Sequence, residues 1–191
     1  MGAAAEKLRM SEAEYLEWES RAKEKHEYID GEIFAMVGAS ERHNRVAGNI
    51  FFHLRQATRG RSCRVFMPDM KLQIANYRTY YYPDVMLVCD DHDDHPIYKT
   101  APCFIAEVLS SSTETTDQRE KWSRYRNIPS LRYYLMADSR RPRAKLLTRT
   151  EGDQWTEQVL DRGDVVEIAC GDAQLTLSLD DLYEDTGLLT W

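Results

Sequence analysis

Apolar residues recur at helical spacing in two stretches near the start of the chain. The first opens with Ser11-Glu12-Ala13-Glu14, a capping-box pattern, and its Tyr15, Trp18 and Ala22 fall on one helical face. The second covers residues 40–60, with a serine cap at its start and a glycine stop at its end. Its apolar stripe consists of Val46, Ile50, Leu54 and Ala57. The pattern predicts two helices, the first packed through its aromatic side chains.

Runs of apolar and β-branched residues predict strands between and after these helices. Residues 26–37 form two runs around Asp30-Gly31, a turn pair typical of a β-hairpin. The later strands are predicted at residues 64–67, 70–75, 80–89, 103–109 and 131–137. The runs 80–89 and 103–109 are apolar enough to lie at the centre of a sheet.

The second half of the chain completes the predicted fold. A polar capping segment, residues 110–116, precedes a third helix that contains Lys121 and ends before Pro129. Residues 143–191 show short strands and a short helix near Asp180. The order of helices and strands predicts an α/β sandwich in which a mixed sheet is flanked by helices, and the strand after the third helix runs parallel to its neighbour.

Length and charge limit the classes of protein to consider. A chain of 191 residues that is 42% hydrophobic can bury one continuous core, so we expect a single domain over residues 1–191. Its 32 acidic and 25 basic side chains give a net charge of −7, which offers no overall attraction to polyanions. Any contact with nucleic acid must therefore be local.

The cysteines and the chain start bear on the compartment. Cys63, Cys89, Cys103 and Cys170 lie far apart without a Cys-x-x-Cys pair, which favours buried thiols in a reducing compartment over a zinc ribbon or a disulfide framework. The N-terminal segment soon becomes charged, and no apolar run approaches the ~20 residues that a membrane span needs. We expect a cytoplasmic protein without membrane contact.

Two carboxylates interrupt the most apolar strands. Asp84 stands in Tyr82-Pro83-Asp84-Val85, and Glu107 stands in Ile105-Ala106-Glu107-Val108-Leu109. A buried carboxylate is costly unless a cation or hydrogen bonds compensate it. Neighbouring strands with one carboxylate each can converge on Mg²⁺, which prefers oxygen ligands. The competing interpretation is that both side chains pair with arginines or face solvent at strand ends.

Motifs in a characteristic order extend from about Met10 to Asp185. They are Glu27-Tyr28-Ile29-Asp30-Gly31-Glu32, His43, Pro83-Asp84-Val85, Glu107-Val108-Leu109-Ser110, Ser112-Thr113, Asp117, Lys121, Tyr125, Tyr133-Tyr134-Leu135 and Asp138. Together they resemble the Uma2 family, also called DUF820, which is assigned to the PD-(D/E)XK superfamily of restriction-endonuclease-like folds. The resemblance implies a phosphodiesterase that acts on DNA, with Asp84 and Glu107 as ligands of Mg²⁺ or Mn²⁺.

One position departs from the superfamily pattern. A lysine is expected two residues after the second carboxylate, and here that position is Leu109. Lys121 is the best substitute, because its helix can pack back across the sheet and direct the ammonium at the metal site. It would orient or deprotonate the attacking water, or stabilise the charged transition state. The alternative is a solvated lysine within the charged run of residues 117–121.

The segment Asp69-Met70-Lys71 is a rival source of the catalytic lysine. It has the acid-x-lysine spacing that Glu107 lacks, and it would need an acidic partner such as Glu27 or Glu32. Its strand is more polar, which suggests a sheet edge, although Asp69 could still lie near the site.

Further polar residues carry weaker signals. Glu27 could add a carboxylate ligand, and His43 could shuttle a proton or contact substrate, although a histidine on a helix surface is more often solvated. The loop of residues 90–95 combines acidic and histidine side chains, which are more often solvated than metal-bound. Two basic clusters could contact phosphates or form surface ion pairs. They are Arg55, Arg59, Arg61 and Arg64, and Arg140, Arg141, Arg143 and Lys145.

The sequence thus predicts a Mg²⁺- or Mn²⁺-dependent DNA endonuclease. The first alternative is a non-catalytic member of the same fold that binds DNA or a protein partner. The second is a glycosidase that uses Asp84 and Glu107 as acid and nucleophile. Cutting both DNA strands favours two sites related by a two-fold axis, so we also expect a homodimer, with residues 80–82 or the C-terminal strands in its contact.

Overall fold

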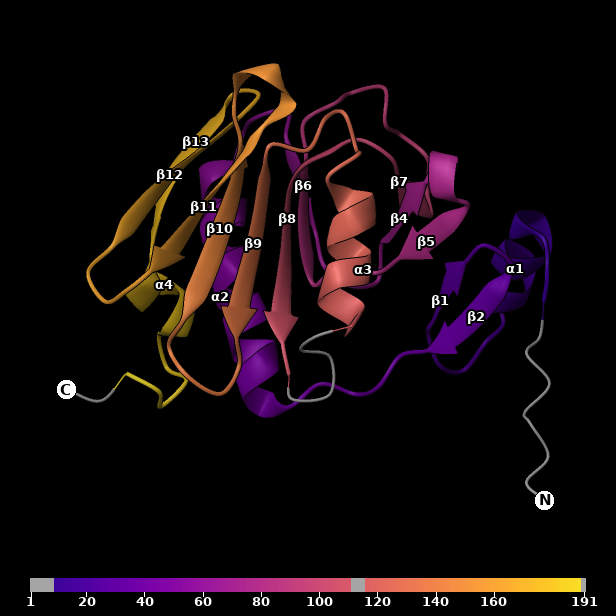
Figure 1. The fold of residues 1–191 in the computed structure, drawn as a ribbon, viewed down its shortest axis with the longest axis horizontal. Helices are drawn as coiled ribbons and strands as arrows, with labels where there is room; N and C mark the ends of the chain where they lie inside the picture. The colour runs from indigo at the N-terminus through magenta and orange to yellow at the C-terminus, as the bar shows by residue number, and fades with distance from the viewer. Residues whose placement is uncertain (1–8, 111–115, 190–191) are drawn as a thin grey trace.

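The computed structural model describes residues 9–110 and 116–189, with only the backbone described for residues 116–118. Two β-sheets stand side by side with helix α3 between them, and a β-hairpin and helix α2 cover the far side of the larger sheet (Figure 1). The helices of this described part are α1 (Glu12–Glu19), α2 (Glu41–Ala57), α3 (Thr116–Tyr125) and α4 (Leu179–Tyr183). This arrangement is the predicted α/β architecture.

The larger sheet has six strands and is mixed. In spatial order its strands are β11 (Trp155–Leu160), β10 (Ala144–Arg149), β9 (Tyr133–Asp138), β8 (Pro102–Leu109), β6 (Val85–Val88) and β3 (Arg64–Phe66). Strands β8 and β9 are parallel and the other pairs are antiparallel, so the predicted parallel strand after the third helix is confirmed. The two parallel strands are joined through α3, which lies against the sheet face seen in Figure 1.

The second sheet has five strands and includes the predicted N-terminal hairpin. Its order is β2 (Glu32–Ala35), β1 (His26–Ile29), β5 (Thr79–Tyr81), β4 (Lys71–Ile74) and β7 (Tyr98–Lys99). Asp30 and Gly31 both have positive φ in the turn that joins the hairpin strands, as the Asp-Gly pair predicts. A separate hairpin consists of β12 (Val165–Cys170) and β13 (Ala173–Ser178).

The prediction of one strand over residues 80–89 is wrong. This run forms β5 of one sheet and β6 of the other, with Tyr82-Pro83-Asp84 between them. Pro83 has no N–H group to donate to a ladder, so a central strand cannot continue through it. The break matters for the site, because it leaves Asp84 at the junction of the two sheets.

Two apolar cores hold the layers on the six-stranded sheet. On one face, Ile50 and Leu54 of α2 pack with β12, β13 and α4. On the other, Tyr125 of α3 packs with Leu72 and Tyr81 of the five-stranded sheet. Complete burial of a residue such as Ile50 contributes about 1.5–3 kcal/mol. These cores fix α2 and α3 on opposite faces of β8.

Helix α1 begins as predicted but packs differently. The Ser11 hydroxyl accepts a hydrogen bond from the Glu14 amide, and the Glu14 carboxylate accepts one from the Ser11 amide, so the capping box is present. Tyr15 is buried and stacks on Tyr28 with a centroid distance of 4.9 Å. Trp18 is 38% exposed, so only Tyr15 of the two predicted aromatic contacts is buried.

The expectation of four free thiols is wrong. Disulfides join Cys63 to Cys89 and Cys103 to Cys170. The first pair is adjacent because Arg64 of β3 lies opposite Val88 of β6, which places the flanking cysteines side by side. The second pair ties β8 to β12. Both pairings arise from strand order, so cysteine spacing along the chain cannot show them.

The structure also limits two other expectations. Tyr80, Tyr81 and Tyr82 are all buried, so they cannot supply the contact of a homodimer, and that part of the prediction is wrong. Within residues 9–110 and 116–189, no helix combines the length and apolar character needed to cross a membrane.

Candidate active site

A cavity of about 770 Å³ lies where the two sheets meet. Its walls come from the first hairpin, the start of α2, the end of β8 and α3. Five polar residues predicted from the sequence line this cavity. They are Glu27, His43, Asp84, Glu107 and Lys121.

Asp84 is held by two elements on either side of it. Its Oδ2 atom accepts a hydrogen bond from the Val108 amide of β8 at 2.7 Å and lies 3.2 Å from Nε2 of His43. His43 stands in the first turn of α2, where its own amide donates to the Ser40 hydroxyl. Burial lowers the pKa of His43, but the hydrogen bond and charge of Asp84 outweigh this effect and raise it overall.

Glu107 is almost fully buried on β8. Its Oε1 atom accepts a hydrogen bond from the Tyr125 hydroxyl at 2.7 Å and lies 3.5 Å from Nζ of Lys121. Burial raises the pKa of Glu107 to about 8, the Lys121 charge opposes this shift, and the charges of Asp84 and Glu27 add to it. The carboxyl group thus sits in a region with an excess of negative charge.

Lys121 joins Glu27 to Glu107. Its Nζ atom lies 2.9 Å from Oε1 of Glu27, and the ammonium stands 5.2 Å from the ring centre of Tyr81. The amide of Tyr82 donates to the same Glu27 oxygen at 3.4 Å. Since Lys121 is 8% exposed, it is not the solvated lysine of the competing interpretation. Helix α3 therefore delivers a cation to the carboxylates of β1 and β8.

The rival segment lies elsewhere. Asp69 forms an ion pair with Lys25, and its side chain is 88% exposed. Lys71 is buried on β4 beside the ring of Tyr82, and the acidic partner proposed for it, Glu27, contacts Lys121 instead. The other acidic partner considered, Glu32, lies 3.7 Å from Arg9. The structure thus gathers one set of the predicted residues and leaves Asp69 and Lys71 outside it.

The acidic loop at residues 90–95 has a structural role. Asp93 accepts hydrogen bonds from the amides of Thr100 and Ala101, both at 2.8 Å. The carbonyls of Asp93 and His95 accept from the ammonium of Lys99. The carboxylate and carbonyl groups therefore stabilise the turn into β7.

The predicted basic clusters contain several side chains that are engaged within the chain. Arg64 donates to the carbonyls of Asp90 and Asp93. Arg140 and Arg141 both bind the carboxylate of Asp138. These arginines therefore serve local structure in the chain as described.

Two features of the site were missed from the sequence. Tyr125 holds Glu107, although only its place in the family motif drew attention to it. Residues 34–39, at the end of β2 and in its connection to α2, form an apolar wall of the cavity, and Val37 is 86% exposed. The available signal was an apolar run directly before the Ser40 cap.

The donor set fits a hard divalent cation. Asp84, Glu107 and Glu27 bring three carboxyl groups to one cavity, whereas Lys121 brings one full positive charge. Within the described residues, no group of three acidic, histidine or cysteine side chains is arranged to hold a metal ion. Mg²⁺ commonly uses only one or two carboxylates and completes its shell with water and phosphate oxygens. Asp84 and Glu107 suit that mode of binding.

Comparison with known proteins agrees with this architecture. The Uma2 family, described as "Putative restriction endonuclease", matches residues 12–180. This chain belongs to the Uma2 family. Of the residues that carried the resemblance, Ser112 and Thr113 lie outside the described residues, as does the side chain of Asp117.

Similar proteins occur in cyanobacteria. The uncharacterised protein slr1290 of Synechocystis is 36% identical over 148 residues, which cover 77% of this chain and 78% of the relative. The uncharacterised protein sll1609 of the same organism is 38% identical over 149 residues, covering 76% and 84%. A crystal structure from Anabaena variabilis, described as "a putative nuclease belonging to DUF820", has a TM-score of 0.72 at 15% identity. The match covers 91% of this chain and 97% of that one, so the two chains share a fold.

Proposed function

We propose that this Uma2 protein hydrolyses phosphodiester bonds of DNA with Mg²⁺ or Mn²⁺. The observation that carries the proposal is the convergence of Asp84 and Glu107 on one cavity where, among the described residues, the two buried carboxyl groups face a single buried ammonium, that of Lys121. Such a cluster is costly unless a cation compensates it. The family description supports the same class of reaction.

The carboxylates of Asp84 and Glu107 would hold the ion. When bound, Mg²⁺ lowers the pKa of a water molecule and offsets charge on the phosphate. His43 and the Val108 amide keep Asp84 oriented, while the Tyr125 hydroxyl does the same for Glu107. The Asp84 and Glu107 oxygens are therefore positioned before any substrate arrives.

Lys121 would take the role of the lysine that the superfamily pattern places two residues after the second carboxylate, where this chain has Leu109. The Lys121 ammonium reaches Glu107 from α3 and is aligned by Glu27, whose Oε1 atom lies 2.9 Å from Nζ. From there it orients the attacking water and stabilises negative charge that develops on the phosphate. Glu27 thus acts on the reaction by positioning Lys121.

A non-catalytic module that binds DNA is the second candidate. Leu109 stands where the superfamily places a lysine. Among the described residues, the ammonium that contacts Glu107 is that of Lys121, and it is also paired with Glu27. In this case the buried carboxylates would bind a metal ion, or Glu107 would stay protonated, and DNA would not be cleaved.

Cleavage of supercoiled plasmid DNA separates the candidates. We expect Mg²⁺-dependent nicking that is lost in Asp84→Asn and Glu107→Gln and kept in the exposed controls Asp91→Asn and Glu167→Gln. Calorimetric titration should show that Mn²⁺ binding is likewise lost in Asp84→Asn and Glu107→Gln and kept in the two controls. Metal binding without cleavage by the parent protein would favour the module. Hydrolysis of glycosides without metal would overturn both.

A further inference from the structure

Lys71 is a nearly buried cation without a direct anionic partner in the described part of the chain. It is on strand β4, which lies between β5 and β7, and the residue is 9% exposed. The contact recorded for its ammonium is with the face of the Tyr82 ring, 5.1 Å from the centroid. Among the described residues, no carboxylate or carbonyl forms an ion pair or hydrogen bond with it. Burying such a charge is costly unless an anion reaches it.

A second ammonium stands over the same ring. Lys25 lies 5.9 Å from the Tyr82 centroid, lines the cavity and keeps 43% of its side chain exposed. It donates to the Pro68 carbonyl at 2.9 Å and pairs with the exposed carboxylate of Asp69. Burial lowers the pKa of Lys71, Glu19 opposes this shift, and the charge of Lys25 adds to it.

The carboxylate whose charge acts on Lys71, that of Glu19, is already engaged. Glu19 accepts hydrogen bonds from the Tyr82 hydroxyl at 2.8 Å and from the His26 amide at 2.9 Å, and its other oxygen lies 3.1 Å from Nδ1 of His26. These contacts fix the Tyr82 ring that both ammonium groups approach. They leave Glu19 few lone pairs for Lys71.

The position of the ring connects this pair to the candidate site. Tyr82 lines the cavity and precedes Pro83-Asp84 in the break between the two sheets. Lys25 therefore stands at one edge of the cavity that holds Asp84 and Glu107, and Lys71 lies outside the cavity lining, over the Tyr82 ring that forms part of this edge. A polymer of phosphates that places one phosphate at Asp84 can place a neighbouring one at this edge.

We infer that Lys25 and Lys71, together over the Tyr82 ring, bind a backbone phosphate of nucleic acid next to the phosphate that is cut. This inference rests on the proposed function and adds a substrate-positioning site to it. Because the chain carries a net charge of −7, nucleic acid gains affinity only from such local cationic sites. Phosphate contacts of this kind set the register of the substrate and do not read its sequence.

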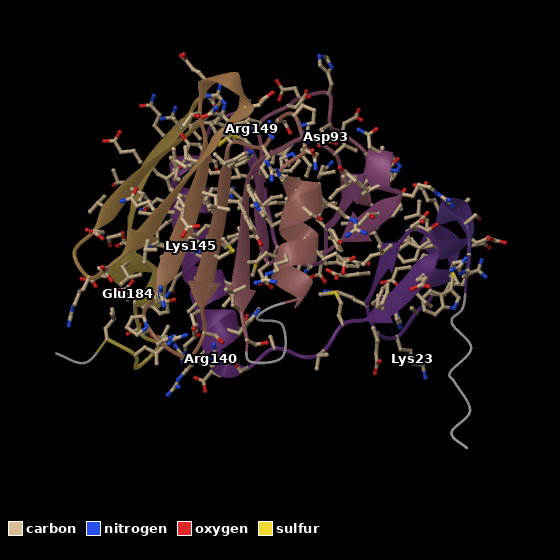
Figure 2. The ribbon with its side chains drawn as sticks, viewed as in Figure 1. Lys23, Asp93, Arg140, Lys145, Arg149 and Glu184 are labelled. Carbon is tan, nitrogen blue, oxygen red and sulfur yellow. A yellow bond between two sulfur atoms is a disulfide. The ribbon has the colours of Figure 1, made fainter. Side chains whose placement is uncertain are left out.

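Binding of a short fluorescent DNA duplex, measured in Ca²⁺ over a series of salt concentrations, tests the inference. Each lysine that neutralises a phosphate steepens the slope of log K against log salt by about 0.9. We expect Lys71→Met and Lys25→Met each to weaken binding and to reduce the slope by roughly that amount. Lys145→Met is the matched control, since Lys145 lies on β10 away from the five-stranded sheet and pairs with Glu157 (Figure 2).

Separate outcomes distinguish this inference from the proposed function. If the parent protein cleaves DNA but both lysine variants keep its affinity and salt slope, the phosphate site is wrong and the nuclease stands. If the slopes fall as expected but no condition gives cleavage, the site stands on a non-catalytic module. Calorimetry with inorganic phosphate tests the other source of the same chemistry. Phosphate binding that is lost in Lys71→Met while DNA binding is unchanged would overturn the assignment to nucleic acid.

Discussion

His43 Nε2 lies 3.2 Å from Asp84 Oδ2, so the first turn of α2 fixes the carboxylate that ends the break between the two sheets. The same oxygen accepts the Val108 amide of β8 at 2.7 Å. Asp84 is therefore oriented by a helix and a strand that pack on each other through the core. The other oxygen of Asp84, Oδ1, and the remaining lone pairs of the carboxylate are left for a cation.

Replacing His43 should weaken metal binding without removing a metal ligand. Loss of a side chain that orients a ligand typically costs 10–100-fold in metal affinity. We expect His43→Ala to raise the Kd for Mn²⁺ by about 10–100-fold in calorimetric titration. His92→Ala, in the exposed acidic loop, should leave the Kd unchanged. An unaltered Kd in His43→Ala would show that the Val108 amide suffices to orient Asp84.

Lys121 should affect the rate far more than DNA affinity. A contact made mainly to the transition state depresses kcat and not ground-state binding. We expect Lys121→Met to lower kcat by about 10²–10³-fold, the usual loss for one charge-stabilising donor. DNA binding in Ca²⁺ should change little, and the exposed Arg119→Ala should keep its kcat. Full Mg²⁺-dependent cleavage by Lys121→Met would exclude this role for α3.

Two carboxylates of the cavity could be predicted from the sequence because each is a charged residue within an apolar run. Asp84 and Glu107 are charges in apolar runs, and such residues are recognisable without any knowledge of the fold. Lys121 was found differently, from its place in the family motif and the absence of a lysine at Leu109. Its contact with Glu27 depends on how β1 and α3 approach each other, which no local pattern records.

The errors have the same physical origin. The run 80–89 looks like one strand because its apolar pattern continues through Pro83, while the change of sheet depends on tertiary contacts. The disulfide between Cys103 and Cys170 spans a sequence separation of 67, so only the packing of β12 on β8 brings the sulfurs together. Local chemistry could thus be inferred from the sequence, and long-range partners could not.

Glu107 should make the stability of the metal-free protein depend on pH. Its pKa is raised from 4.5 to about 8, so between these values the folded protein holds a proton that the unfolded chain releases. The free energy of unfolding therefore falls as the pH rises through this window. We expect the Tm of the metal-free protein to drop as the pH approaches 8, and Glu107→Gln to reduce that drop.

Added metal should oppose this effect. Carboxylate ligands bind metal in their deprotonated form, so stabilisation by Mg²⁺ should grow as the pH rises toward 8. The exposed Glu167→Gln serves as the control and should follow the parent protein throughout. His43 also has a raised pKa and contributes with the same sign, so the difference between parent and Glu107→Gln isolates the glutamate. Identical profiles of Tm against pH for the parent protein and Glu107→Gln would refute the raised pKa of Glu107.

The disulfide between Cys103 and Cys170 should stabilise the protein more than the one between Cys63 and Cys89. In the chain-entropy model, a longer closed loop restricts the unfolded chain more, and the two separations are 67 and 26. The corresponding contributions are about 4.4 and about 3.5 kcal/mol. We expect Cys103→Ser to lower the Tm more than Cys63→Ser under non-reducing conditions, and reductant to bring both variants close to the reduced parent.

The location of the longer disulfide gives it a second consequence. Cys103 lies on β8, the strand that carries Glu107, while Cys170 ends β12 of the separate hairpin. The bond therefore fastens that hairpin to the strand behind the site, and hydrogen exchange in β12 and β13 should accelerate when the bond is cut. Thiol titration of the unfolded, unreduced protein should detect no free thiol. Four free thiols together with the same Tm in reductant would show that the hairpin is held by its apolar contacts alone.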